Sequence, residues 1–188
     1  MVVIAIVVVL AGLLFPAVQS VLERAKKVQA KNDLTQIVTA VNAFYSEYGR
    51  YPLPSTASGD GYPSGATTGT TSKDVLNPLR NLDPILDPRQ IVFISPPEDT
   101  TQPSPRGKIG SDGQFHDPWG NAYGISIDAD YDNQVPNPYT ADTGAGPTKI
   151  RQGVIAWSIG KDAKLGNNGD NSLRSSAGVQ SDDVISWQ

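Results

Sequence analysis

The chain contains no cysteine and a single histidine, His116, among its 188 residues. The absence of cysteine excludes disulfide bonds and thiolate metal sites. The sequence also lacks a P-loop, a dinucleotide-binding fingerprint and an HExxH motif, and no nucleophile elbow surrounds any of its serines. Because His116 stands in a turn beside Asp117, we interpret it as a surface or turn residue. The sequence therefore predicts a protein that is not an enzyme.

Positive charge is also scarce, since 15 Lys and Arg residues face 19 Asp and Glu residues, giving a net charge of −4. A nucleic-acid-binding protein needs a basic surface for its phosphate contacts, so this balance argues against that class. The 18 glycines and 15 prolines imply many turns and loops. A loop-rich domain without disulfides needs another means of stabilisation, and a bound metal is one candidate.

What the chain does have is an uncharged apolar run at its N-terminus, Met1 to Val18 (MVVIAIVVVLAGLLFPAV). A membrane span needs about 20 apolar residues, so this run is somewhat short. No basic residue precedes it and the helical pattern continues beyond it, which disfavours a signal peptide. Two interpretations stay open: a plain membrane anchor, or a helix that starts in the membrane and later packs among copies of itself in a fibre.

Apolar residues recur at steps of three and four as far as Tyr48, which predicts one continuous helix from Met1 to Tyr48. Gly49 is expected to end this helix, and Pro52 to prevent it from restarting. Pro16 is expected to kink or loosen it, because proline removes one backbone donor.

The region between this helix and the C-terminal third, residues 53–114, is predicted to be a variable surface made mainly of loops. Within it, Ser72 to Leu82 is expected to form a short helix capped by Ser72 or Asp74. Arg89 to Ser95 (RQIVFIS) is expected to form a short strand.

Three C-terminal segments are typical of strands: Ala122 to Ile127, Val154 to Ile159 and Val184 to Trp187. Short connections favour an antiparallel sheet, and we expect this sheet to bury one face on the amphipathic half of the helix. The sequence thus predicts an α+β fold, in which a long N-terminal helix packs on a small C-terminal antiparallel sheet.

The expected domain boundaries follow from this fold: a hydrophobic helix half at residues 1–24 and a globular domain at residues 25–188, with the sheet within 115–188. We interpret three aromatic residues as core or sheet-edge residues of this domain, in preference to a ligand platform: Trp119, Trp157 and Trp187.

One acidic loop has carboxylates at alternate positions, Asp128, Asp130 and Asp132, which is similar to the start of a calcium loop. A backbone carbonyl ligand is then expected near Gln134. The distal glutamate of such loops is absent, and Tyr139 occupies its place. The alternative interpretation is a polar turn at the end of a strand.

The N-terminal segment, together with NDLTQIVTAVNAFYSEYGRYP, resembles the N-terminal helix of type IV pilins and of type II secretion pseudopilins. Pro16 matches the helix-breaking proline of that family. The segments DPWGN-Y, GVIAWSIGKD and SDDVISW resemble pieces of the major pseudopilin. In the family, a glutamate-containing stretch and a prepilin peptidase cleavage site precede the equivalent of MVVIAI; neither is present here, and we expect the sequence to be truncated.

The resemblance implies a pilin-like structural subunit that polymerises through its hydrophobic helix into the filament of a type II secretion or type IV pilus-like system. Its expected partners are copies of itself, the inner membrane before assembly, and the assembly machinery. Its expected location is the inner membrane first, then a periplasmic pseudopilus or a cell-surface filament. The residues expected to mediate assembly are Val2, Ile4, Ile6, Val9, Leu13, Leu14, Phe15 and Pro16. The alternative is a monomeric, membrane-anchored extracytoplasmic module that binds a ligand.

The resemblance also implies a calcium site in the loop that follows VIAWSI. By the match to the family, Asp162 provides a side-chain ligand and Ile159 a carbonyl ligand. The downstream acids that complete the site are Asp170, or Asp182 and Asp183. The alternative interpretation of this loop is an ordinary series of Asn and Gly turns.

Overall fold

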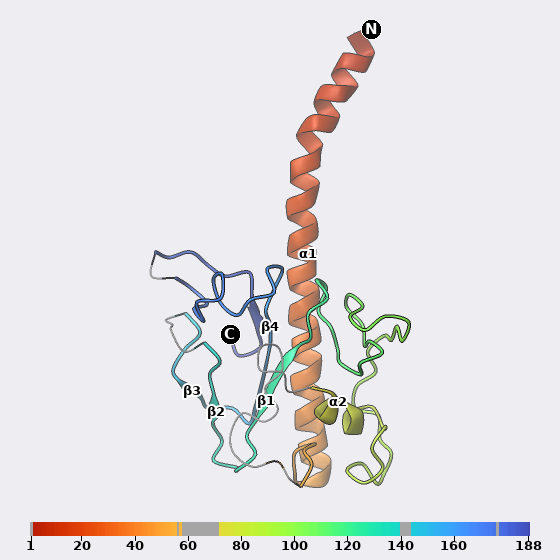
Figure 1. Cartoon of the computed structure of the whole chain (residues 1–188), viewed down its shortest axis with the longest axis vertical. Coiled ribbons are helices and arrows are strands. Elements are labelled where there is room, and N and C mark those ends of the chain that lie inside the picture. The colour runs from red at the N-terminus through yellow and green to blue at the C-terminus, as the bar shows by residue number, and fades with distance from the viewer. Residues whose placement is uncertain (1, 56, 58–71, 140–143, 176) are drawn as a thin grey trace.

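A computed structural model describes the backbone of residues 2–55, 57, 72–139, 144–175 and 177–188, and side chains within these ranges from residue 18 onward. The elements form an α+β arrangement of one long helix and a small antiparallel sheet (Figure 1). Their bounds are α1 (Val2–Tyr48), α2 (Lys73–Leu79), β1 (Gly124–Ile127), β2 (Val135–Pro136), β3 (Lys149–Ile150), β4 (Val154–Ser158) and β5 (Val184–Ile185).

Helix α1 is continuous over 47 residues, as its periodicity predicted. Gly49 ends it as expected: the residue has a φ of 66° and its N–H donates to the carbonyl of Tyr45 at 2.8 Å. Glycine is favoured here because this left-handed conformation strains residues that carry a Cβ atom. The kink was expected at Pro16, and the side chain of Pro16 lies outside those that the structure describes.

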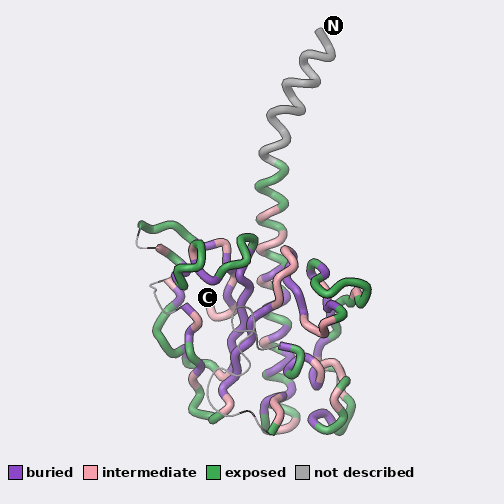
Figure 2. Tube along the Cα trace, viewed as in Figure 1, coloured by how far each residue is buried: buried purple, intermediate pink, exposed green. Residues whose placement is uncertain are grey.

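The main sheet has the strand order β1-β4-β5, and both pairings are antiparallel. One face of the sheet packs against α1, as predicted. The residues buried in this core include Leu34, Ile37, Val41 and Phe44 of α1 and Ile125, Ile127, Val154 and Ala156 of the sheet. Figure 2 shows that burial on α1 is confined to the part beside the sheet, while the described residues above it, 18–29, are exposed or intermediate.

The second face of the sheet is also covered, and this layer was not predicted. Ile155 and Trp157 alternate with the residues that face α1 and enter a separate core with Leu165 and Leu173. The hairpin of β2 and β3 closes this layer, with Val135 paired to Ile150. All five residues of β4 are therefore buried.

Two predictions about the middle region were wrong in detail. Arg89 to Ser95 forms no strand, because the N–H groups of Phe93 and Ile94 both donate to the carbonyl of Leu79, at 2.9 and 3.1 Å, and so bind the end of α2. The predicted short helix exists as α2, and Ser72 stands at its N-cap position. Its side chain makes no capping hydrogen bond, however, and its buried hydroxyl has no partner.

Candidate functional site

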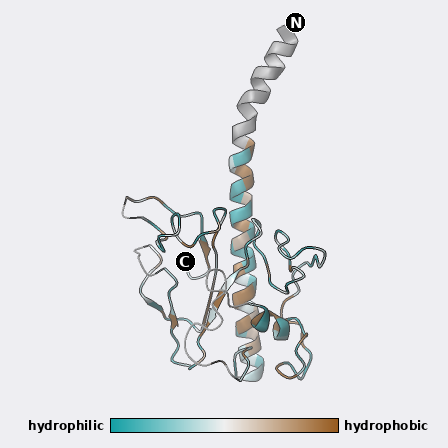
Figure 3. Ribbon diagram, viewed as in Figure 1, coloured by the Kyte–Doolittle hydropathy of each residue, from teal (hydrophilic) through white to brown (hydrophobic). Residues whose placement is uncertain are grey.

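The upper part of α1 carries apolar side chains that no described part of the chain covers. The exposed fractions are 52% for Val18, 62% for Val21, 50% for Leu22 and 61% for Val28. Figure 3 shows hydrophobic and hydrophilic residues alternating along this part of the helix. Over the residues whose side chains are described, no helix is long and apolar enough to cross a membrane. The side chains of the eight predicted assembly residues, Val2 to Pro16, lie outside that part.

Trp119 joins the globular domain to α1 within the stretch that carries this apolar surface, at Glu23 between Leu22 and Val28. Its indole N–H donates to Oε2 of Glu23 at 3.0 Å, while Oε1 of Glu23 accepts from Nζ of Lys26 at 3.0 Å. These hydrogen bonds, that of Trp119 first, lower the pKa of Glu23. Trp119 is half-buried and packs against the core, as predicted for a core or edge residue, but it also lines a polar pocket.

A buried carboxylate fixes the turn that carries Trp119. Oδ1 of Asp117 accepts from the backbone N–H groups of Trp119, Gly120 and Asn121 at 2.8 to 2.9 Å. Its Oδ2 accepts from the hydroxyl of Ser158 at 2.6 Å, which links the turn to β4. Burial raises the pKa of Asp117 against these hydrogen bonds. Trp119 is thus held through both its backbone and its indole ring.

His116 lies in the predicted turn but not at the surface, because only 3% of it is exposed. Nε2 lies 3.1 Å from Oδ2 of Asp112, and Nδ1 lies 3.2 Å from the carbonyl of Gly120. Both ring nitrogens therefore have partners within the turn, and the interpretation as a surface residue was wrong. These contacts give His116 a role in shaping the turn.

The structure brings Asp128, Asp130 and Asp132 together, with carboxylate oxygens within 4.8 Å of one another. Asp128 accepts from the backbone N–H groups of Asp132 and Asn133 at 3.1 and 2.7 Å. Oδ2 of Asp132 lies 3.5 Å from Nζ of Lys149. Hydrogen bonds within the loop and the nearby Lys149 thus already compensate much of the negative charge of these three carboxylates.

A second cluster is formed by Asp162, Asp182 and Asp183, also with oxygens within 4.8 Å of one another. Oδ2 of Asp182 accepts from the N–H groups of Lys161 and Asp162 at 2.5 and 3.1 Å. The structure therefore brings together three of the acids that the sequence suggested as ligands.

Asp183 is the most constrained member of this cluster. Its Oδ2 accepts from the hydroxyl of Tyr139 at 2.8 Å and from the N–H of Gly166 at 2.7 Å. Its Oδ1 is buried and has no hydrogen-bond partner among the described residues. Burial, the largest influence, raises the pKa of Asp183 to about 6. Tyr139, which stands where a calcium loop would have its distal glutamate, thus serves the second cluster instead of the first.

Two other residues suggested for this site have different surroundings. Oδ1 of Asp170 accepts from the N–H groups of Asn167 and Ser172, both at 2.9 Å, so this carboxylate closes a turn of its own loop. Asp170 does not belong to the acidic cluster. The side chain of Ile159 is buried in the outer core, and the ligand role of its carbonyl stays a prediction.

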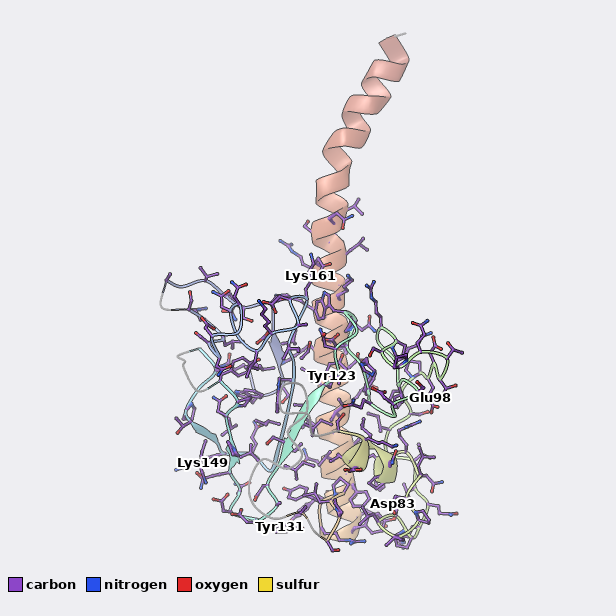
Figure 4. All side chains as sticks on the ribbon, viewed as in Figure 1. Asp83, Glu98, Tyr123, Tyr131, Lys149 and Lys161 are labelled. Carbon is purple, nitrogen blue, oxygen red and sulfur yellow. The ribbon has the colours of Figure 1, made fainter. Side chains whose placement is uncertain are left out.

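The two acidic clusters lie at opposite ends of the globular domain. Figure 4 shows Lys161, which neighbours Asp162, beside α1 at the end from which the helix projects, and Tyr131, which neighbours Asp130 and Asp132, at the other end. The second cluster, Trp119 and the apolar part of α1 therefore occupy the same end of the domain.

No family model, curated protein or solved structure matches this chain. Its function has to be inferred from its own residues and their contacts.

Proposed function

We propose that the chain is a structural subunit that polymerises through α1 into a pilus or pseudopilus filament. The observation that carries this proposal is the exposed apolar surface of Val18, Val21, Leu22 and Val28, which continues the uncharged run of residues 1–18. Burying apolar surface contributes about 25 cal/mol per Å². A helix that exposes so much of it in water gains stability when other copies cover it.

The position of this surface favours an open polymer. The apolar part of α1 lies at one end of the chain, and the lower part is already occupied by the sheet. A copy that covers this surface with a different stretch of its own α1, the arrangement that we propose, makes a heterologous contact. Heterologous contacts that do not close on themselves generate helical filaments.

Before assembly, the apolar run resides in the inner membrane in this proposal. The assembly machinery of a type II secretion or type IV pilus-like system then transfers it into the core of a periplasmic pseudopilus or a surface filament. The globular domain covers the outside of that filament. The alternative function is a monomeric, membrane-anchored module that binds a ligand outside the cytoplasm.

Electron cryomicroscopy of filaments from cells that make the full chain tests this proposal. Leu22→Asp places a charge in the apolar surface and is expected to abolish filaments while the domain stays folded. Ile85→Asp is the matched control, because Ile85 is 84% exposed and its loop contacts the opposite end of α1, where the hydroxyl of Tyr48 donates to Asp87. Filaments made equally by both variants, or a wild-type chain found only as monomers in membranes, would contradict assembly through α1.

A calcium ion held by Asp162, Asp182 and Asp183 is a second part of the proposal. It is favoured by Oδ1 of Asp183, a buried acceptor that has no donor in the part of the chain that the structure describes. Carboxylate oxygens are the ligands that calcium prefers, and the sequence offers no cysteine to compete. When bound, the ion would neutralise two of the three negative charges and join the loop after β4 to the segment before β5.

A further inference from the structure

A polar pocket of about 680 Å³ opens beside the turn that Trp119 joins to α1, and none of the three acids of the proposed calcium site lines it. Its size falls within the range of about 300 to 1,000 Å³ that is typical of small-molecule sites. It is lined by Trp119 and by residues with hydrogen-bonding side chains: Asp99, Gln102, Ser104, Arg106 and Lys108. One aromatic ring thus stands among several polar groups.

The ring of Trp119 is held in place before any ligand arrives. Its indole N–H donates to Glu23 at 3.0 Å, and its backbone N–H donates to Asp117 at 2.9 Å. Because the only polar group of the indole is occupied, Trp119 offers a ligand its apolar ring surface. The electron-rich face of such a ring attracts partly positive C–H groups, which one face of a sugar ring presents.

The polar groups of the pocket fit a ligand that has both hydroxyl groups and negative charge. Arg106 is exposed and forms no ion pair or hydrogen bond with any residue that the structure describes. Asp99 lies 3.9 Å from Lys108, and hydrogen bonds from Thr101 lower its pKa, so it is an ionised acceptor at neutral pH. Gln102 and Ser104 can each donate and accept.

We propose that this pocket binds an oligosaccharide that carries a carboxylate. One sugar ring stacks on Trp119, its carboxylate pairs with Arg106, and hydroxyl groups bond to Asp99, Gln102 and Ser104. Arginine suits this role because its planar guanidinium donates two parallel hydrogen bonds to a carboxylate. The largely polar lining does not suit an apolar ligand. Since the site lies within one chain, it exists in a filament subunit and in a monomer alike, and the proposal does not depend on assembly.

The test measures tryptophan fluorescence of the full chain during titration with a trisaccharide of galacturonic acid. The chain is kept in lauryldimethylamine oxide, a detergent without a sugar headgroup. A Trp187→Phe background removes the other half-buried tryptophan, and Trp157 is only 2% exposed. The methyl ester of the same trisaccharide is the matched ligand, since it keeps the sugar rings and loses the charge.

Arg106→Ala and Arg151→Ala are the matched variants, because both arginines are exposed and each lines a different pocket. We expect saturable quenching by the acidic trisaccharide, weakened about tenfold by Arg106→Ala or by esterification and unchanged by Arg151→Ala. Three results would each overturn the proposal: no saturable change up to about 10 mM, equal binding by Arg106→Ala, or equal binding of the ester.

Discussion

The indole N–H of Trp119 donates to Oε2 of Glu23 at 3.0 Å and joins residues that are 96 positions apart in the sequence. The contact connects the turn before β1 to α1 at Glu23, between Leu22 and Val28 of the exposed apolar surface. Trp119 also packs against the edge of the buried core that holds the lower part of α1 against the sheet. The place where the helix leaves the domain is therefore set by a specific polar contact as well as by apolar packing.

Loss of this contact is expected to loosen the turn without unfolding the domain. Glu23→Ala removes the acceptor and Trp119→Phe removes the donor while keeping a ring in place. Each variant should lose about 1 kcal/mol of stability, since this hydrogen bond to a charged group is only partly buried. A double-mutant cycle of thermal unfolding measures the interaction, and strictly additive losses would show that the two residues are not coupled.

A second contact between α1 and the sheet is buried and should matter more. The hydroxyl of Tyr123 donates to Oδ2 of Asp33 at 2.8 Å, and both side chains are almost fully buried. Tyr123→Phe leaves the acid without this donor, so we expect a loss of about 1 to 3 kcal/mol. Tyr45→Phe, on the exposed side of α1, is the control and should melt like the wild type. Equal melting temperatures for Tyr123→Phe and the wild type would refute this assignment.

The sequence predicted the elements whose apolar residues recur with a regular period. It missed the elements that depend on long-range contacts. Helix α1 and strands β1, β4 and β5 follow from their apolar patterns and their turn residues. Strands β2 and β3 have two residues each, too few to show an alternation, so the second layer of the core could not be foreseen. Arg89 to Ser95 has a strand-like composition, but its N–H groups bind the end of α2 instead.

Some parts of the candidate sites were likewise predicted from the sequence, and others were missed. Asp162, Asp182 and Asp183 were suggested from the sequence, whereas the place of Asp170 depends on how its own loop folds back, which spacing does not reveal. The pocket beside Trp119 was missed because its lining comes from irregular segments between residues 99 and 120. These segments come together around Trp119 only once the chain has folded.

A side chain at Gly124 is expected to destabilise the fold for a steric reason. A Cβ atom at this position would overlap the indole of Trp157 on β4. Gly124→Ala should therefore cost about 1 to 3 kcal/mol, the usual penalty for overpacking a core. Adding Trp157→Phe should recover part of that loss, since the smaller ring leaves room and the indole N–H of Trp157 is buried without a partner. A double variant that melts no higher than Gly124→Ala would contradict this explanation.

Calcium should stabilise the chain if the cluster of Asp162, Asp182 and Asp183 holds it. At a free concentration of about 100 times Kd, a single site contributes about 2.7 kcal/mol, which is a shift of several degrees in Tm for a chain of this size. Chelation should remove that shift, and Asp162→Ala should abolish the response. Asp170→Asn is the matched control in the same loop and should keep it. Identical melting curves with calcium and with chelator would exclude the site.

Without metal, Asp183 should make stability depend on pH in an unusual direction. Burial, the largest influence, raises its pKa in the folded state from 3.8 to about 6, so the folded chain binds a proton more readily than the unfolded chain. Stability from this group therefore rises as the pH falls from about 7 to about 4, and is lost again as the pH rises through about 6. The total change is at most about 3 kcal/mol.

Asp183→Asn isolates this effect, because other acids with raised pKa values, such as Asp33 and Asp117, remain in the variant. Urea unfolding in a chelating buffer at pH 7, 6, 5 and 4 should show the wild type gaining stability, relative to the variant, as the pH falls. Calcium should oppose this gain, since protons compete with the ion for the same carboxylate. A wild type and a variant with parallel pH profiles would mean that Asp183 does not take up a proton in this range.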